Sequence, residues 1–376
     1  RAGLHVGPVL LRENSAEDVA RGAKPLEVEG LAKPTAARVM SVAAGGQTLL
    51  TPEAREDLGQ TTLKVQSHGH WMIKGVPEPV ELFEVGEPQA RFVAPPDSEK
   101  VHRVVRVDDW WMPVREIPNN LPLQPSSFVG RERELEEVKS ALAGARLVTL
   151  LGMGGLGKTR LSLQVASEVM HQFTDGVWFV DLSPIRDAEL VASEAAHVLG
   201  VTEEPGRPLL QTLCAHLKQR RVLLILDNCE HLIKAAADLA HAIVRAAPNV
   251  RIVSSSREPL HVPGEKTYPI LPLPVPKKDD GLETLAKSTA VRLFVERAQA
   301  HKPVFALTER EAPLVAELVA RLEGIPLALE LAAARVRSMS VLDINARLKH
   351  RYKLLTGGGR VLQERQQTLR ALVDWS

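Results

Sequence analysis

The sequence predicts an α/β protein: a parallel sheet with helices on both faces, followed by a small helical bundle. Three observations support this fold class. From residue 128 onward, short apolar segments alternate with helical patterns, a glycine-rich motif follows the first of these segments, and after residue 288 only helical patterns occur. Continuous apolar strands are typical of parallel sheets, because helices cover both of their faces.

The glycine-rich motif, residues 152–159, reads GMGGLGKT and fits the phosphate-binding pattern G-x-x-x-x-G-K-S/T. It lies between an apolar run and a helical pattern, which is the strand–turn–helix context that the pattern requires. Lys158 would contact the β- and γ-phosphates, and the Thr159 hydroxyl would ligate Mg²⁺. The alternative, a flexible turn beside a chance Lys-Thr pair, is the weaker interpretation. Backbone amides would approach the phosphates at four glycines, Gly152, Gly154, Gly155 and Gly157.

Composition and length limit the possible functions. A chain of 376 residues exceeds one ordinary core, so two or three domains are expected. Its 47 basic and 46 acidic residues nearly cancel, which argues against non-specific binding to nucleic acid or to an anionic membrane. The two cysteines, Cys214 and Cys229, lie in or beside apolar segments and exclude a disulfide scaffold. We predict two buried thiols, a cytoplasmic location and no membrane span.

The chain divides into five predicted segments. Residues 1–87 alternate strands and helices, 88–127 form a proline-rich linker, 128–275 hold the parallel sheet, 276–350 form a helical subdomain, and 351–376 begin a truncated further domain. Because six prolines lie between 94 and 127, we expect no regular structure there. The sequence begins without Met and stops in mid-pattern, so we expect it to be a piece of a longer protein.

Apolar runs and capping residues place the individual elements. In the first segment we expect strands at 3–11, 71–74 and 79–85, and helices at 36–43 and 52–58. The sheet should contain strands at 147–151, 177–182, 222–226, 250–255 and 267–270, and helices at 131–143, 158–171, 187–198, 209–219 and 230–246. The bundle should contain helices at 288–299, 309–322, 327–338 and 341–348.

Two charged residues follow neighbouring strands of the predicted sheet. Asp227 ends the apolar run 222–226, which would place it beside the phosphates, where it could hold Mg²⁺. A solvated strand cap is the alternative, and the upstream Lys158 and Thr159 favour the metal. Arg257 follows the next strand and could sense the terminal phosphate. From position alone, a surface arginine is an equal alternative.

Five motifs, in order, resemble those of the STAND signal-transduction ATPases, and within them the NB-ARC-related bacterial regulators. They are VGRE at 129–132, the glycine-rich motif, LDNCEH at 226–231, SSREPL at 255–260 and GIPLA at 324–328. The resemblance covers residues 128–376. It implies that Val129 and Gly130 line an adenine pocket, that Arg257 is the phosphate sensor, and that Pro326 packs on the base. Residues 368–376 are similar to the entry of the winged-helix domain that usually follows.

The resemblance implies a switch in which ADP holds a closed state and ATP favours an open, self-associating one. Its partners would be the nucleotide, further copies of the chain and other domains of the same polypeptide. Asn228 stands where many ATPases carry a second acid, and Glu230 lies close in sequence. We therefore expect slow ATP hydrolysis at most.

Residues 1–87 resemble the second half of a class III nucleotide cyclase domain, through segments at 1–7, 36–40, 45–50 and 73–85. The resemblance implies that Arg38 and Lys74 serve the substrate and that Glu27 lies near the base. Pro34 occupies the position of an essential Asn, and a proline offers no side-chain hydrogen bond. The family's metal-binding aspartates belong to the first half. We expect no cyclase activity from this segment, and two solvated cations are the alternative for Arg38 and Lys74.

Two functions from different classes remain, with the switch favoured. The second is an adenylate cyclase that the ATPase module regulates, and an assay for cyclic AMP separates the two. Transcriptional regulation is a third possibility that follows from the resemblance alone, because no DNA-reading helix is visible in the sequence.

Overall fold

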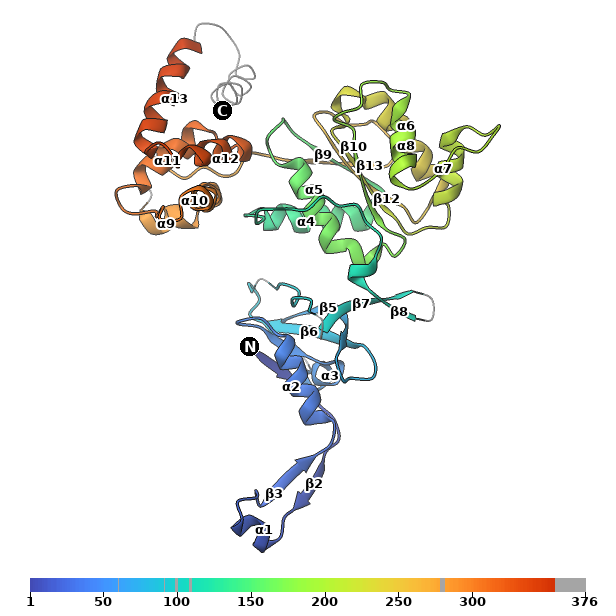
Figure 1. The fold of residues 1–376 in the computed structure, drawn as a ribbon, viewed down its shortest axis with the longest axis vertical. Coiled ribbons are helices and arrows are strands. Elements are labelled where there is room, and N and C mark those ends of the chain that lie inside the picture. The colour runs from blue at the N-terminus through green and yellow to red at the C-terminus, as the bar shows by residue number, and fades with distance from the viewer. Residues whose placement is uncertain (60, 91, 99–100, 108–109, 278–280, 356–376) are drawn as a thin grey trace. The chain divides into compact units, whose positions relative to one another are not determined.

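The computed structural model describes residues 1–59, 61–90, 92–98, 101–107, 110–277 and 281–355, with only the backbone for 349–355 (Figure 1). The chain forms two compact units. The first takes in Arg1–Pro118 and Met170–Thr174, and the second takes in the rest. No helix of the described residues is long and apolar enough to cross a membrane. The predicted start of a winged-helix domain lies outside the described residues from 356 onward.

The first unit is built on a six-stranded mixed sheet with the order β1-β4-β6-β5-β7-β8. Its strands are β1 (Ala2–Leu4), β4 (Thr48–Leu50), β5 (Lys64–Ile73), β6 (Val80–Gly86), β7 (Val101–Val107) and β8 (Trp110–Pro113). Helix α2 (Ala32–Val42) packs in one apolar cluster with Leu82, and α3 (Pro52–Leu58) packs in another with Phe83. Since consecutive residues of a strand point to opposite faces, the two helices cover opposite faces of the sheet.

A two-stranded antiparallel sheet of β2 (Leu10–Glu13) and β3 (Leu26–Glu29) completes this unit, with α1 (Ala16–Ala20) between its strands. The single strand expected at 3–11 is therefore wrong, because β1 ends at Leu4 and β2 begins at Leu10. Pro8 lies in the gap and has no N–H to donate to a ladder.

The expectation that 94–127 lacks regular structure is also wrong. Strand β7 pairs with β5, β8 pairs with β7, and a 3₁₀ turn, η1 (Val114–Glu116), follows. No proline lies within β7 itself: Pro96 and Pro118 lie outside the strands, and Pro113 is the last residue of β8, opposite Val104. The proline-free run 101–107 was therefore available as a strand.

The second unit contains a five-stranded, fully parallel sheet with the order β10-β11-β12-β9-β13. Its strands are β9 (Leu147–Leu151), β10 (Val177–Asp181), β11 (Leu223–Asp227), β12 (Arg251–Ser256) and β13 (Glu265–Pro269), each close to its predicted position. The helices around it are α4 (Glu132–Gly144), α5 (Lys158–Val169), α6 (Leu190–Val198), α7 (Leu209–Leu217) and α8 (Ile233–Ala246), with the 3₁₀ turn η3 (Cys229–His231). The 3₁₀ turn η2 (Met170–Gln172), which follows α5, belongs to the first unit.

Helices cover both faces of this sheet. Leu224 and Leu226 of β11 belong to a core cluster with α6, α7 and α8. Leu223 and Ile225 are equally buried but lie outside that cluster, so they face the opposite side. Helices α4 and α5 contact each other and the sheet strands (Figure 1). The predicted fold class is confirmed.

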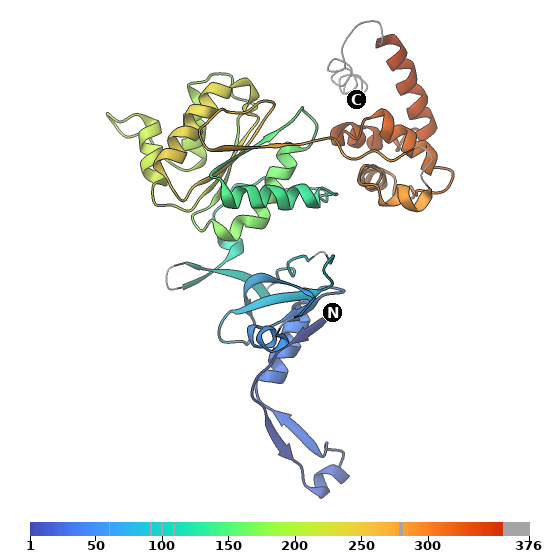
Figure 2. The same ribbon diagram turned by 180° about the vertical axis from the view of Figure 1, so that it is seen from behind.

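The remaining helices group together after an extended segment, as both views show (Figure 2). They are α9 (Leu282–Lys287), α10 (Thr289–His301), α11 (Ala312–Arg321), α12 (Pro326–Arg335) and α13 (Val341–Leu355). Helix α10 packs on α12, and α11 packs on α13. The helical bundle is confirmed, and α9 is an addition that the sequence did not suggest.

The two cysteines differ in exposure, so the expectation of two buried thiols holds for only one of them. Cys229 is fully buried and its thiol donates to the Leu226 carbonyl at 3.4 Å, whereas Cys214 is partly exposed. Burial raises the pKa of both thiols.

We predict that Cys229 reacts with a thiol reagent about tenfold or more slowly than Cys214 in the native chain, because a buried, protonated thiol is a poor nucleophile. The variants Cys214→Ser and Cys229→Ser isolate the two rates, and both thiols should react alike in denaturant. Rapid native labelling of Cys229 would contradict the packing of η3.

Candidate functional site

The glycine-rich loop joins β9 to α5 at the carboxyl edge of the parallel sheet. Gly155 has φ 80° and Gly157 has φ 85°, a left-handed conformation that favours glycine. Helix α5 then begins at Lys158. The backbone amides before and within its first turn are therefore available to an anion at the helix N-terminus.

Lys158 folds back over this loop. Its side chain is buried, and its ammonium donates to the carbonyls of Gly152 at 2.7 Å and Met153 at 3.1 Å. Burial lowers the pKa of Lys158, the charges of Glu230 and Asp227 raise it, and that of Arg257 lowers it. The ammonium is thus held beside the loop with three charged neighbours around it.

Thr159 meets Asp227, the last residue of β11. The Thr159 hydroxyl lies 2.9 and 2.8 Å from the two carboxylate oxygens of Asp227. Ser255, on the neighbouring β12, donates to the same carboxylate at 2.5 Å. Burial raises the pKa of Asp227, and these two hydroxyls lower it. Asp181 lies beside Asp227 in register on β10 and adds a second carboxylate at this edge.

A cavity of about 290 Å³ opens next to the loop. Val129 and Pro326 line it, together with Gly154, Gly155, Gly157, Lys158 and Thr159. Gly130 and Gly152 are not among its lining residues. Gly130 instead lies against Thr289, so a Cβ atom added at Gly130 would meet the Thr289 side chain. The Gly152 carbonyl accepts a hydrogen bond from the Lys158 ammonium. Small-molecule sites begin at about 300 Å³, so the cavity suits a compact ligand.

The helical bundle contributes directly to this cavity. The amide of Leu327, at the start of α12, donates to the Gly155 carbonyl at 3.1 Å. Leu293 and Leu327 supply apolar surface from the bundle, and Phe128 and Leu273 supply it from the segments on either side of the sheet. An apolar wall of this kind suits a planar base.

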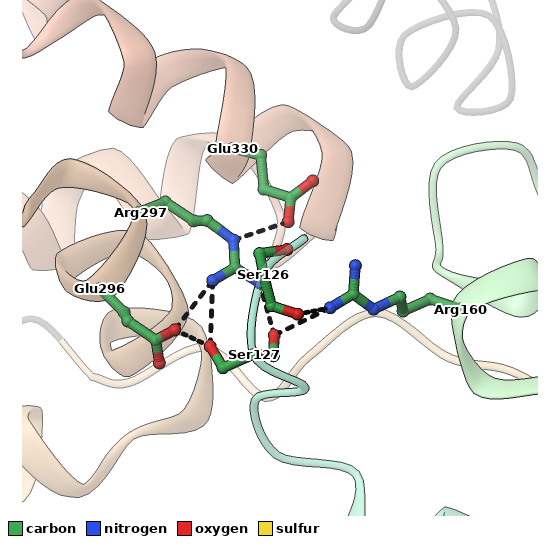
Figure 3. Close-up of polar contacts among 6 residues, drawn as sticks. All are labelled: Ser126, Ser127, Arg160, Glu296, Arg297 and Glu330. Carbon is green, nitrogen blue, oxygen red and sulfur yellow. Dashed lines mark hydrogen bonds and ion pairs between the residues drawn. The ribbon is translucent and has the colours of Figure 1, made fainter. Parts of the chain in front are cut away.

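A second link between the bundle and the sheet runs through Ser126 and Ser127. Figure 3 shows Arg160 and Arg297 approaching this pair from two sides. Arg160 donates to both serine carbonyls, and Arg297 donates to the Ser127 carbonyl at 2.8 Å. Glu330 accepts from Arg297 at 3.0 Å and thereby offsets the repulsion between the two guanidinium groups.

Arg257 pairs with a carboxylate. Its Nε lies 3.1 Å from Oε1 of Glu230, in the turn η3 that follows β11. Asn228 leads into this turn with φ 65°, and its amide donates to Ser255 at 2.9 Å. Asn228 lines the cavity.

Of the residues predicted for a cyclase site, Arg38 and Lys74 lie near each other and Glu27 lies apart. The Arg38 guanidinium, on α2, packs against Gly75, next to Lys74. Glu27 lies instead on β3, in the separate two-stranded sheet, in register with Arg12. Lys74 is exposed.

Sequence reasoning did not identify four residues of the phosphate end and the cavity, which are Ser255, Arg160, Arg297 and Glu330. Ser255 could have been found, because it ends the strand beside Asp227 in the predicted parallel order. The other three make contacts with residues far away in the sequence, and no local sequence pattern identifies them.

The residues at the loop fit a magnesium-bound polyphosphate. Thr159 and Asp227 supply the hard oxygen donors that Mg²⁺ prefers, and Lys158 supplies a cation for phosphate. A Cβ atom built at Gly154 or Gly157 would meet nothing within 4 Å, so both positions face open space. Because glycine has no Cβ atom, the loop amides stay accessible from that space.

Comparison with known proteins agrees with this geometry. The NB-ARC domain family matches residues 131–235. A protein of Mycobacterium tuberculosis, named as a candidate HTH-type transcriptional regulator, is 44% identical over 239 residues, which are 64% of this chain and 26% of that protein. An uncharacterized protein of the same species is 38% identical over 251 residues, 67% of this chain and 61% of its own length. The regulatory protein AfsR of Streptomyces griseus is 27% identical over 61% of this chain and 23% of its own.

Solved structures give two further similarities. A STAND protein with a tetratricopeptide repeat sensor from Pyrococcus horikoshii is 15% identical, with a TM-score of 0.41 over 62% of this chain and 34% of that one. A Trypanosoma brucei adenylate cyclase, in its monomeric state, is 28% identical, with a TM-score of 0.21 over 29% of this chain and 42% of that one.

The chain spans only about a quarter of the named regulators it matches and 61% of the uncharacterized relative. Its phosphate loop, parallel sheet and family match together lead to one identification. Residues 131–235 of the chain form an NB-ARC domain, a P-loop module that implies nucleotide binding.

Proposed function

We propose that this chain is the nucleotide switch of a multidomain regulator, binding ADP or ATP with Mg²⁺ and hydrolysing ATP slowly. The convergence of Lys158, Thr159 and Asp227 at one edge of the sheet carries the proposal. Lys158 would exchange its two carbonyl acceptors for phosphate oxygens. Thr159 and Asp227 would hold Mg²⁺, which neutralises phosphate charge when bound.

The apolar end of the cavity would bind the nucleotide base. We propose that Val129 forms its wall from the sheet side and that Pro326 covers the base from the bundle, while Gly130 supports this wall from behind, against Thr289. Apolar surface from Phe128 and Leu293 supports an adenine there. The domains would then divide as 128–275 for the sheet and 276–350 for the bundle.

The switch follows from the position of the bundle. Because Leu327 donates to the glycine-rich loop, and Arg297 holds the segment before Val129, the bundle contacts both ends of the cavity. A nucleotide can bias the bundle only through contacts that differ between ADP and ATP. Arg257 is the proposed sensor of the γ-phosphate, and self-association would follow in the ATP state. The regulators among the relatives support a regulatory output, which includes transcription.

We predict that Lys158→Ala weakens ADP binding by about 100-fold or more in calorimetry on the purified chain, because a charge-assisted phosphate contact is lost. Lys234→Ala, which removes an exposed lysine of α8, should bind as the unaltered chain does. An ADP affinity of the Lys158 variant equal to that of the unaltered chain would overturn the assignment of the site.

Metal dependence gives a separate prediction. Chelation of Mg²⁺ should weaken ATP binding by roughly 10-fold, since Asp227 and Thr159 then lose the ion that joins them to the phosphates. In Asp227→Asn the affinity should already be low and should no longer respond to chelation. Asp238→Asn, an exposed substitution on α8, is the control. An Asp227 variant that keeps the full metal response would exclude this carboxylate as a ligand.

If the chain were an adenylate cyclase, it would form cyclic AMP, which a nucleotide switch does not. We expect no cyclic AMP from this chain with ATP and Mn²⁺, because Pro34 offers no hydrogen bond and Glu27 lies on a sheet separate from that of β5, which Lys74 follows. Detection by mass spectrometry, with an active class III cyclase as the positive control, decides the matter. Sustained cyclic AMP formation would establish the alternative.

A further inference from the structure

Glu230 occupies a position at the site that the proposed function has not used. After Asp227 the chain turns through Asn228, whose left-handed conformation is fixed by the bond from its amide to Ser255. The turn η3 then buries Cys229 beneath the sheet edge. Glu230 therefore lies in the turn that directly follows β11, at the same edge of the sheet as Asp227, and both charges raise the pKa of Lys158.

The two oxygens of the Glu230 carboxylate have different surroundings. Oε1 accepts from Nε of Arg257 at 3.1 Å. Oε2 is buried and has no hydrogen-bond partner among the described residues. A buried acceptor without a donor is costly, on the order of 1–3 kcal/mol, and usually marks a place for water or a ligand group. This oxygen, Oε2, belongs to a carboxylate whose charge acts on the pKa of Lys158.

Arg257 and Glu230 differ in exposure. The Arg257 side chain is 58% exposed, whereas that of Glu230 is 17% exposed. Both residues lie at the carboxyl edge of the sheet, Glu230 in the turn after β11 and Arg257 directly after β12, and both charges act on the pKa of Lys158. A γ-phosphate, with more negative charge than a carboxylate, would compete with Glu230 for Arg257.

We propose that Glu230 positions and deprotonates the hydrolytic water, and that its ion pair with Arg257 keeps it idle until a γ-phosphate draws Arg257 away. The inference rests on the proposed function and assigns the acid that Asn228 cannot supply. An Asn side chain has no basic oxygen that could take a proton, whereas a carboxylate does.

The reaction step is a hydrolysis. The water oxygen bonds to the γ-phosphorus as the bond from that phosphorus to the β–γ bridging oxygen breaks, and the electron pair of the broken bond stays on ADP. The proton of the water passes to the Glu230 carboxylate and then to solvent, leaving ADP and inorganic phosphate. Arg257 neutralises charge on the departing phosphate and can pair again with Glu230 once the phosphate leaves.

The test compares Glu230→Gln with the unaltered chain in two measurements. Single-turnover hydrolysis of ATP should slow by about 100-fold, since the glutamine cannot accept the proton. The affinity for the non-hydrolysable analogue AMP-PNP relative to ADP should rise by about 5-fold, because the analogue no longer competes with a carboxylate for Arg257. A purely structural role for Glu230 would weaken both nucleotides together.

Two further variants complete the experiment. Glu258→Gln removes a neighbouring exposed carboxylate and should change neither measurement. Arg257→Gln should lower AMP-PNP affinity about 5-fold and leave ADP affinity unchanged. Binding of ADP by the unaltered chain is the separate test of the proposed function.

Given that binding, a Glu230→Gln chain with normal hydrolysis and an unchanged affinity ratio overturns the inference. An unaltered chain that binds ATP and does not hydrolyse it over hours overturns the catalytic role of Glu230. Equal loss of ADP and AMP-PNP affinity in Glu230→Gln reduces the residue to a structural one.

Discussion

The contact of Thr159 with the Asp227 carboxylate is the interaction on which the rest of this site depends. It exists because β9 and β11 flank β12 in a parallel sheet, so the loop after β9 and the end of β11 reach the same edge. Ser255 on β12 bonds the same carboxylate from between them. One buried acid therefore fixes the relative positions of three strand ends, and the glycine-rich loop is fixed with them.

Around this centre the charges are arranged in two layers. The inner layer joins Lys158, Thr159 and Asp227 at the phosphate end of the cavity. The outer layer joins Arg297 and Glu330 of the bundle to the segment before Val129 (Figure 3). The inner layer is suited to binding the phosphates. The outer layer is suited to transmitting a conformational change, because, of the two layers, only the outer one has ion pairs and hydrogen bonds that join the sheet to the bundle. A ligand that alters the inner layer can reach the bundle through Leu327 and Gly155.

Much of the second unit could be predicted from the sequence, because strands buried on both faces are continuous apolar runs that alternate with helical patterns. The approach of Thr159 to Asp227 was expected from the phosphate-binding motif and from the position of Asp227 at the end of a strand in a parallel sheet. The first unit was harder, since β7 lies among prolines and β1 is only three residues long. The contacts of Arg297 with Ser127 and of Arg257 with Glu230 join residues far apart in the chain, so no local pattern marks them.

A crystal structure of the chain with Mg²⁺ and ADP would locate the nucleotide relative to Lys158, Thr159 and Asp227. We expect the β-phosphate against the amides between Gly155 and Thr159, with the Lys158 ammonium moved from the Gly152 and Met153 carbonyls onto phosphate oxygen. The metal should lie between Thr159 and Asp227. A nucleotide bound elsewhere, or Lys158 still bonded to the loop carbonyls beneath a bound phosphate, would contradict the proposed site.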